Sequence, residues 1–205
     1  MRRIAVVLGL CALLLPMAAW ADGIDLANKF GTVSVTNAGV VSKGAELMSY
    51  NGIVAPPKRS LGSVNFSTGG LTSGDIWTGG TFSSAGSSFV VTSGGGGYGQ
   101  PAKGIIFSGA FVGPITWTLV SHTGKYNYSF TLSGTIYGAL YTGRNVTGTT
   151  TQYITLDKNQ WNQDQRGWVS LGKTNLAVPE PGTLGLLGTG LIAVAGTMRR
   201  KLLGA

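Results

Sequence analysis

Residues 115–133 read ITWTLVSHTGKYNYSFTLS and contain two alternating runs, separated by a short connection that holds a glycine. Hydrophobic side chains recur at every second position, namely Ile115, Trp117 and Leu119 in the first run and Tyr126, Tyr128, Phe130 and Leu132 in the second. A spacing of two places each set on one face of a β-strand. Residues 121–125 therefore predict the connection of a β-hairpin.

The same pattern continues on both sides of this hairpin. Residues 104–111 predict a strand before it, VGP at 112–114 a turn, and residues 135–141 a strand after it, so that four antiparallel strands follow one another. Weaker strand candidates are residues 32–36, 60–66, 76–82, 88–93, 150–157 and 167–171. About ten short strands with glycine-rich turns indicate an all-β sandwich or barrel. Of the two, we expect an antiparallel β-sandwich, jelly-roll-like or meander.

The charge of the chain is concentrated partly in its two ends. The formal net charge is +8, but Arg2, Arg3, Arg199, Arg200 and Lys201 lie in the end segments. Between those segments, ten Lys and Arg stand against six Asp and Glu. The ten are scattered along the sequence, whereas nucleic-acid binding needs a concentrated basic stripe. We therefore expect no nucleic-acid partner.

Residues 1–21 have the three zones of a secretory signal peptide. Arg2 and Arg3 give a positive start, residues 4–17 are apolar, and Ala19 and Ala21 form an A-x-A cleavage site. We expect signal peptidase to cut after Ala21, and the general secretion machinery to export the rest.

Two other interpretations of this segment are weaker. A first transmembrane helix would need a longer apolar run. A lipoprotein signal centred on Cys11 would need a small residue in place of Leu10. Cys11 is the only cysteine in the chain, so the exported part would hold no disulfide, thiolate nucleophile or cysteine-ligated metal.

Residues 178–205 form a three-part C-terminal segment. The motif Pro179-Glu180-Pro181 precedes a Gly- and Leu-rich apolar run at 182–198, and Arg199, Arg200 and Lys201 follow it. The run predicts a single transmembrane helix at the short limit, and the basic cluster would stay cytoplasmic as a stop. The prolines predict an extended segment before it. The alternative is an ordinary C-terminal anchor.

This segment resembles the PEP-CTERM sorting signal of Gram-negative bacteria, which has the same three parts in the same order. The resemblance implies that an exosortase, an integral-membrane enzyme, recognises Pro179, Glu180 and Pro181 and cuts at or near them. Together with the signal peptide at 1–21, this sorting signal at 178–205 leaves an exported Gly/Ser/Thr-rich β domain at 22–177. The chain would be the substrate of that reaction.

The β domain contains few side chains that could act in catalysis. His122 is the only histidine and falls in the predicted hairpin connection. Asp157 and Asp164 flank Trp161 in DKNQWNQD, with Trp168 nearby. This set predicts a sugar site in which acids and amides bind hydroxyls and an indole stacks on a ring. The alternative is a polar loop with aromatic packing anchors.

Two further activities fit the same loop less well. A glycoside hydrolase would need Asp157 and Asp164 to face each other across a sugar. Calcium would need more oxygen ligands than Asp157, Asn159 and Asp164 supply. We predict no metal and no cofactor.

The sequence thus favours a non-enzymatic protein that is anchored in the inner membrane as a precursor and then delivered to the cell surface or extracellular matrix. We expect a structural role with exopolysaccharide as a partner. A carbohydrate-binding module or adhesin is the alternative, and a secreted glycoside hydrolase is the least favoured class.

Overall fold

The computed structural model describes residues 22–95, 101–124, 127–157 and 165–178. Residues 23–178 make up one compact unit. Within the described ranges the chain is all-β, as predicted. Its strands are β1 (Asp22–Thr36), β2 (Gly39–Tyr50), β3 (Ile53–Val54), β4 (Gly62–Ser67), β5 (Leu71–Asp75), β6 (Gly79–Phe82), β7 (Ser88–Ser93), β8 (Gly104–Thr123), β9 (Asn127–Leu140), β10 (Asn145–Asp157) and β11 (Gln165–Val178).

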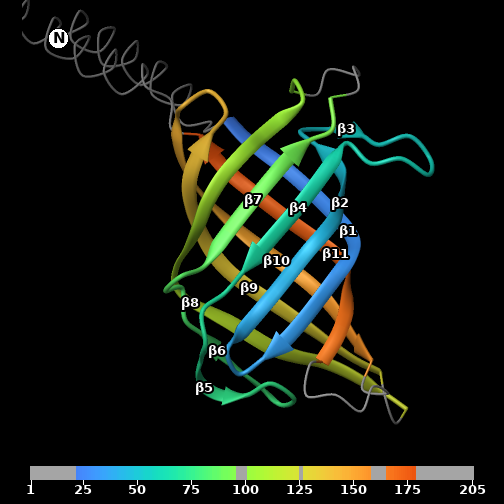
Figure 1. Cartoon of the computed structure of the whole chain (residues 1–205), viewed down its shortest axis with the longest axis vertical. Helices are drawn as coiled ribbons and strands as arrows, with labels where there is room; N and C mark the ends of the chain where they lie inside the picture. Colours follow the sequence, from blue (N-terminus) through green and yellow to red (C-terminus); the bar gives the residue numbers. More distant parts are fainter. Residues whose placement is uncertain (1–21, 96–100, 125–126, 158–164, 179–205) are drawn as a thin grey trace, which may run out of the picture. The chain divides into compact units, whose positions relative to one another are not determined.

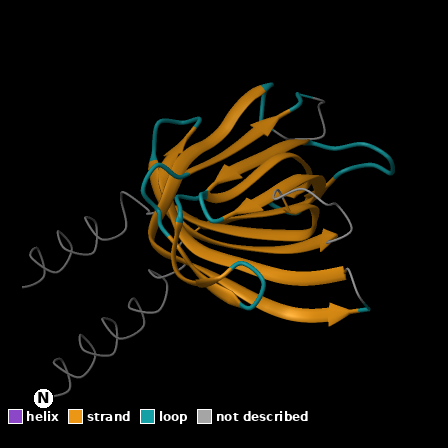
Figure 2. Ribbon diagram, turned by 60° about the horizontal axis from the view of Figure 1, so that its bottom comes forward, coloured by secondary structure: helices purple, strands orange, loops and turns teal. Residues whose placement is uncertain are grey.

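Eight of these strands form a closed antiparallel β-barrel. The sheet runs β8-β7-β4-β2-β1-β11-β10-β9, and β9 then pairs with β8 from Leu140 opposite Phe107 to Asn127 opposite Thr123. Figures 1 and 2 show the strands curving around the barrel. The predicted β-sandwich is therefore wrong. A sandwich would leave sheet edges unpaired, whereas the β8–β9 pairing removes them.

The long strand β8 makes this closure geometrically feasible. The predicted turn at residues 112–114 is instead an irregularity within β8, where the register with β9 shifts between Val112 and Thr116 and Gly113 has a φ of 75°. Glycine adopts this left-handed conformation without steric cost. The bend lets β8 pair with β7 near one end and with β6 at Ile115 to Thr118. The predicted strands at 126–133 and 135–141 are likewise one strand, β9. The predicted hairpin between β8 and β9 is confirmed.

Side chains fill the barrel interior, as the bore of an eight-stranded barrel allows. Trp117 of β8 stacks on Phe130 of β9 with ring centroids 4.3 Å apart, and its indole N–H donates to the Ile76 carbonyl at 2.9 Å. Phe89 packs edge-to-face against both Phe107 and Phe111. These rings are almost wholly buried.

A chain of buried polar side chains links β1, β10 and β11 inside the barrel. Asn28 Nδ2 donates to Gln152 Oε1 at 3.0 Å, and Gln152 Nε2 donates to Thr150 Oγ1 at 2.8 Å. The hydroxyls of Thr150 and Thr174 lie 2.8 Å apart. A Cβ at Gly172 would collide with the side-chain oxygens of Gln152 and Asn28, so a larger residue there would displace this chain. Buried polar groups are mostly hydrogen-bonded, so this chain favours one register of the three strands, while Asn28 Oδ1 is buried without a hydrogen-bond partner among the described residues.

Within the described ranges, no helix has the length and hydropathy needed to cross a bilayer. The structure gives no support to the predicted transmembrane helix at 182–198, whose residues lie outside those ranges, as do residues 1–21 with the predicted cleavage site.

The β8–β9 seam yields a test of closure. Gly109 lies opposite Gly138, and a Cβ at Gly138 would collide with the Ser108 carbonyl and Gly109. Gly138→Ala should therefore lower the free energy of unfolding by about 1–3 kcal/mol, the usual cost of overpacking. Urea unfolding of the exported protein, followed by tryptophan fluorescence, would measure the change. Gly94→Ala is the control, because its Cβ would lie 3.4 Å from the Leu61 carbonyl oxygen, an ordinary contact. Equal losses in the two variants would contradict the close approach.

Tyr50, at the end of β2, yields a pH test. Burial raises the pKa of the Tyr50 phenol, and the charge of a nearby ionised Tyr141 raises it further. Because the folded pKa lies above the unfolded one, this stabilisation is fully present below about pH 10 and is lost as the pH rises through the folded pKa. Tyr50→Phe should thus flatten the alkaline fall in unfolding free energy, measured by urea unfolding across that range. A slope identical to that of the parent would exclude the contribution.

Candidate functional site

The structure brings together two of the four predicted sugar-site residues. Asp157, the last residue of β10, lies opposite Arg166 of β11, and the neighbouring Thr155 lies opposite Trp168. Trp168 is 43% exposed on the outer face of the barrel. Trp161 and Asp164 fall in residues 158–164, outside the described ranges. The separation of Asp157 and Asp164 is therefore untested.

Hydroxyl groups cover the outer face of β8, β9 and β10. Thr116 of β8 lies opposite Ser133 of β9, which lies opposite Thr151 of β10. Ser133 Oγ donates to Thr151 Oγ1 at 3.2 Å. The period of two along each strand sets these rows. We call the set the hydroxyl wall: Thr116, Thr118, Thr131, Ser133, Thr135, Thr147, Thr149, Thr151 and Thr155.

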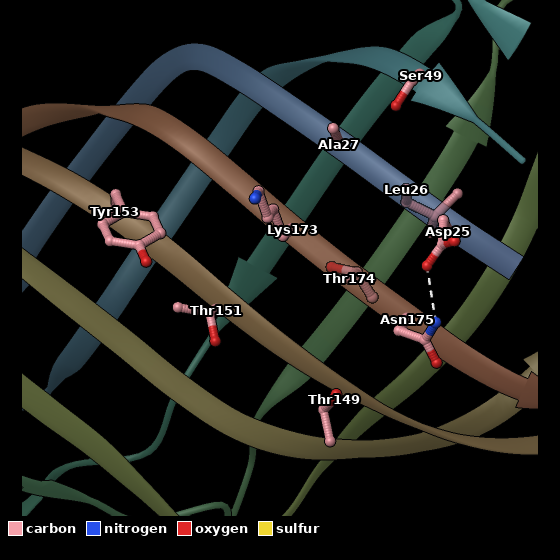
Figure 3. A pocket seen from close by; sticks show the side chains of 10 residues that line it. All are labelled: Asp25, Leu26, Ala27, Ser49, Thr149, Thr151, Tyr153, Lys173, Thr174 and Asn175. Carbon is pink, nitrogen blue, oxygen red and sulfur yellow. Dashed lines mark hydrogen bonds between the residues drawn. The ribbon is translucent and has the colours of Figure 1, made fainter. Parts of the chain in front are cut away.

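A shallow hollow of about 470 Å³ adjoins the hydroxyl wall. Figure 3 shows that its lining comes from β10, β11, β1 and β2. Asn175 of β11 donates its amide to the Asp25 carboxylate of β1 at 2.7 Å. The lining residues are Asp25, Leu26, Ala27, Ser49, Thr149, Thr151, Tyr153, Lys173, Thr174 and Asn175. Carboxylate, amide, ammonium and hydroxyl groups at one surface are the donors and acceptors that a sugar hydroxyl requires.

One exposed ring lines this hollow, and a second lies on the same outer face of the barrel. Tyr153 lines it and is 39% exposed, while Trp168 lies on the neighbouring strand close to Tyr153 in register. Ser170 Oγ donates to the Tyr153 carbonyl at 3.1 Å, which ties the two strands together where the register shifts. Tyr and Trp rings combine an apolar face with a polar edge, so they can bind ligands that remain partly exposed to solvent.

A second hollow of about 390 Å³ lies further along β1 and β11. Thr32, Ser34 and Val41 line it together with Lys43 and Arg166. The two hollows show that this side of the barrel is indented at two places along the same pair of strands. An extended chain of several units could occupy such a surface, whereas neither hollow is a deep pocket for one small molecule.

His122 takes part in packing. Its ring stacks on Tyr128 with centroids 4.0 Å apart and an interplanar angle of 12°. Among the described residues, no group of three or more His, Cys, Asp or Glu is arranged to hold a metal ion.

Sequence reasoning missed the hollow because its walls meet only in three dimensions. Asp25 and Asn175 are 150 residues apart. The only local signal was weak: in TGTTTQYIT at 147–155, Tyr153 falls at the same alternate positions as Thr147, Thr149 and Thr151, which places it on their face of the strand. Nothing in the sequence indicated that β1 lies beside β11.

Comparison with known proteins identifies the C-terminal segment. Residues 177–201 match the PEP-CTERM protein-sorting motif, which confirms the resemblance carried by Pro179, Glu180, Pro181 and the basic cluster at 199–201. The chain is therefore an exported protein that an exosortase sorts. No curated protein and no solved structure matches the chain.

The matched motif yields a direct test. Replacing Pro179 and Pro181 with Ala should remove the two prolines by which we expect the exosortase to recognise the motif, so that the uncut precursor accumulates. Immunoblotting of membrane and extracellular fractions would measure the ratio of precursor to product. Pro114→Ala, at an exposed position in β8, is the control and should leave processing unchanged. Normal processing of the double variant would contradict recognition of these prolines.

Proposed function

We propose that this protein is a non-enzymatic component of the extracellular matrix whose barrel binds the exopolysaccharide of its own cell. The observation that carries the proposal is the hydroxyl wall with its adjoining hollow and the two exposed rings, Tyr153 and Trp168. Hydroxyl, amide and carboxylate groups would bind sugar hydroxyls, and the rings would stack on the apolar faces of sugar units.

The shape of the surface supports a polymer as the ligand. Both hollows are shallow, and the second continues along the same two strands as the first. A polysaccharide repeats the same weak contacts along its length, so a long surface with modest sites gains affinity by multivalency. A deep pocket would be needed for tight binding of one small sugar.

The absence of catalysis is part of the proposal. The Asp25 carboxylate in the hollow is hydrogen-bonded to Asn175, and the His122 ring is stacked on Tyr128. Neither geometry presents a free acid–base pair to a ligand, which is what glycoside hydrolysis uses. A carbohydrate-binding adhesin would use the same face but would recognise the surface of another cell.

The route to the matrix follows from the two ends of the sequence. We propose that signal peptidase removes residues 1–21, and that the apolar run at 182–198 holds the precursor in the inner membrane with Arg199, Arg200 and Lys201 in the cytoplasm. Exosortase cleavage near Pro179 then delivers the barrel to the cell surface or matrix.

The test of binding uses the exported protein and the host's own purified polysaccharide. Tyr153→Ala and Trp168→Ala should each weaken retention on immobilised polysaccharide about tenfold, because a ring that anchors a contact contributes about 1–2 kcal/mol. Affinity electrophoresis or surface plasmon resonance would measure it.

Tyr141→Ala is the matched control, because Tyr141 is 60% exposed but neither lines the hollow nor belongs to the hydroxyl wall. Retention that is unchanged in both wall variants, or that falls equally in the control, would contradict the proposed face. Retention on polysaccharide of other cells alone would favour the adhesin.

A further inference from the structure

One end of the barrel gathers the loops that adjoin both of its chain ends. Strand β1 begins at this end and β2 ends at it, because Leu26 lies opposite Tyr50. Strand β11 also ends at it, beside the start of β10, because Ala177 lies opposite Thr147. Figure 1 shows β2, β7 and β11 ending at this end. The connections at 51–61, 101–104 and 141–145 complete it.

Basic side chains dominate these connections. Lys58 and Arg59 lie after β3, Lys103 lies before β8, and Arg144 lies before β10; all four are exposed. The connections themselves contain no Asp or Glu. Asp25, near the start of β1, accepts a hydrogen bond from Asn175 in the hollow.

Exposed apolar side chains stand among these charges. Val54 is 72% exposed, Tyr141 60% and Ile105 55%, and they are three of the four most exposed large hydrophobic residues in the described ranges. We call the seven side chains the basic rim: Val54, Lys58, Arg59, Lys103, Ile105, Tyr141 and Arg144. Exposed apolar and basic side chains on one end of a protein are typical of proteins that lie on anionic lipid.

The sequence fixes how far this end can be from the membrane. β11 ends at Val178, and the apolar run begins at Gly182, four residues later. Four fully extended residues span about 14 Å. If the apolar run holds the precursor in the bilayer, as in the proposed function on which this inference rests, the end of β11 stays within that reach of the lipid headgroups.

We propose that the basic rim docks on anionic phospholipid at the outer face of the inner membrane while the precursor awaits cleavage. The four cations attract the headgroup phosphates, and Val54, Ile105 and Tyr141 enter the headgroup region. Docking holds the barrel upright on the bilayer and keeps Pro179-Glu180-Pro181 at the level of the membrane surface, where an integral-membrane enzyme can reach it.

Cleavage would also release the barrel. Each basic residue near an anionic bilayer raises the affinity about fivefold, and salt weakens this attraction. A surface patch of this size binds only weakly without a second membrane anchor, because stable attachment takes two signals. The rim therefore orients a tethered precursor without trapping the cut product.

The test places one fluorophore at each end of the precursor. In a Cys11→Ser background, which contains no other cysteine, Thr142→Cys labels the basic rim and Ala38→Cys labels the β1–β2 turn. Roughly 40 Å of strand separates the two ends. The precursor is taken from cells without exosortase and reconstituted in phosphatidylglycerol-containing vesicles that carry nitroxide-labelled lipid.

We expect quenching at residue 142 to exceed quenching at residue 38 at least threefold. Replacing Lys58, Arg59, Lys103 and Arg144 with Gln should reduce the difference to the part that the short tether alone maintains, and so should vesicles of phosphatidylcholine alone. The matched control replaces Lys29, Lys43, Arg166 and Lys173 with Gln. This control removes the same charge from exposed positions on the barrel strands and should preserve the difference.

Equal quenching at the two ends of a vesicle-bound precursor would overturn the docking of the rim. So would an equal effect of the rim and control variants. A separate flotation assay with processed protein at low salt distinguishes the two proposals. If the precursor fails to stay with vesicles but the processed protein still floats with phosphatidylglycerol through the rim residues, the anchored precursor is wrong and the rim is supported.

Discussion

The pairing of β8 with β9 is the interaction on which the rest of the barrel depends. It joins the two edges of an eight-stranded sheet, and the Trp117–Phe130 stack at 4.3 Å spans this seam. Closure leaves the eight barrel strands without an edge, so only the short strands β3 and β5 are edge strands in the described part of the sheet. Closure also holds β9, β10 and β11 side by side, so that their outward side chains form one continuous face.

The local features of the fold were predictable from the sequence, and its closure was not. The hairpin at 121–125 and the strand at 88–93 are confirmed because alternation and glycine act locally. Strand β2 was missed because Gly44, with a φ of 67°, interrupts its alternation where the register with β4 shifts. Sandwich and barrel share the same strand pattern, and only the pairing of the edges distinguishes them.

In the candidate site, too, local features were predictable from the sequence and long-range contacts were not. Trp168 was predicted, because a tryptophan near acids and amides is visible in a linear sequence, whereas Asp157, predicted with it, is not part of the hollow or the hydroxyl wall. The Asp25–Asn175 pair and the hollow around it were not predicted, since strands 150 residues apart build them. The sorting motif was found entirely from sequence, because its three parts are contiguous and an enzyme recognises them as a chain segment.

In our proposals, the outer face of the barrel binds a polysaccharide and the basic rim binds anionic lipid. The sorting motif begins where the last strand of the barrel ends. The most direct measurement is intact mass spectrometry of the protein recovered from the extracellular matrix. Our account predicts a product that begins at Asp22 and ends at or near Pro179-Glu180-Pro181. A matrix protein that still carries Met1 and Ala205 would contradict it.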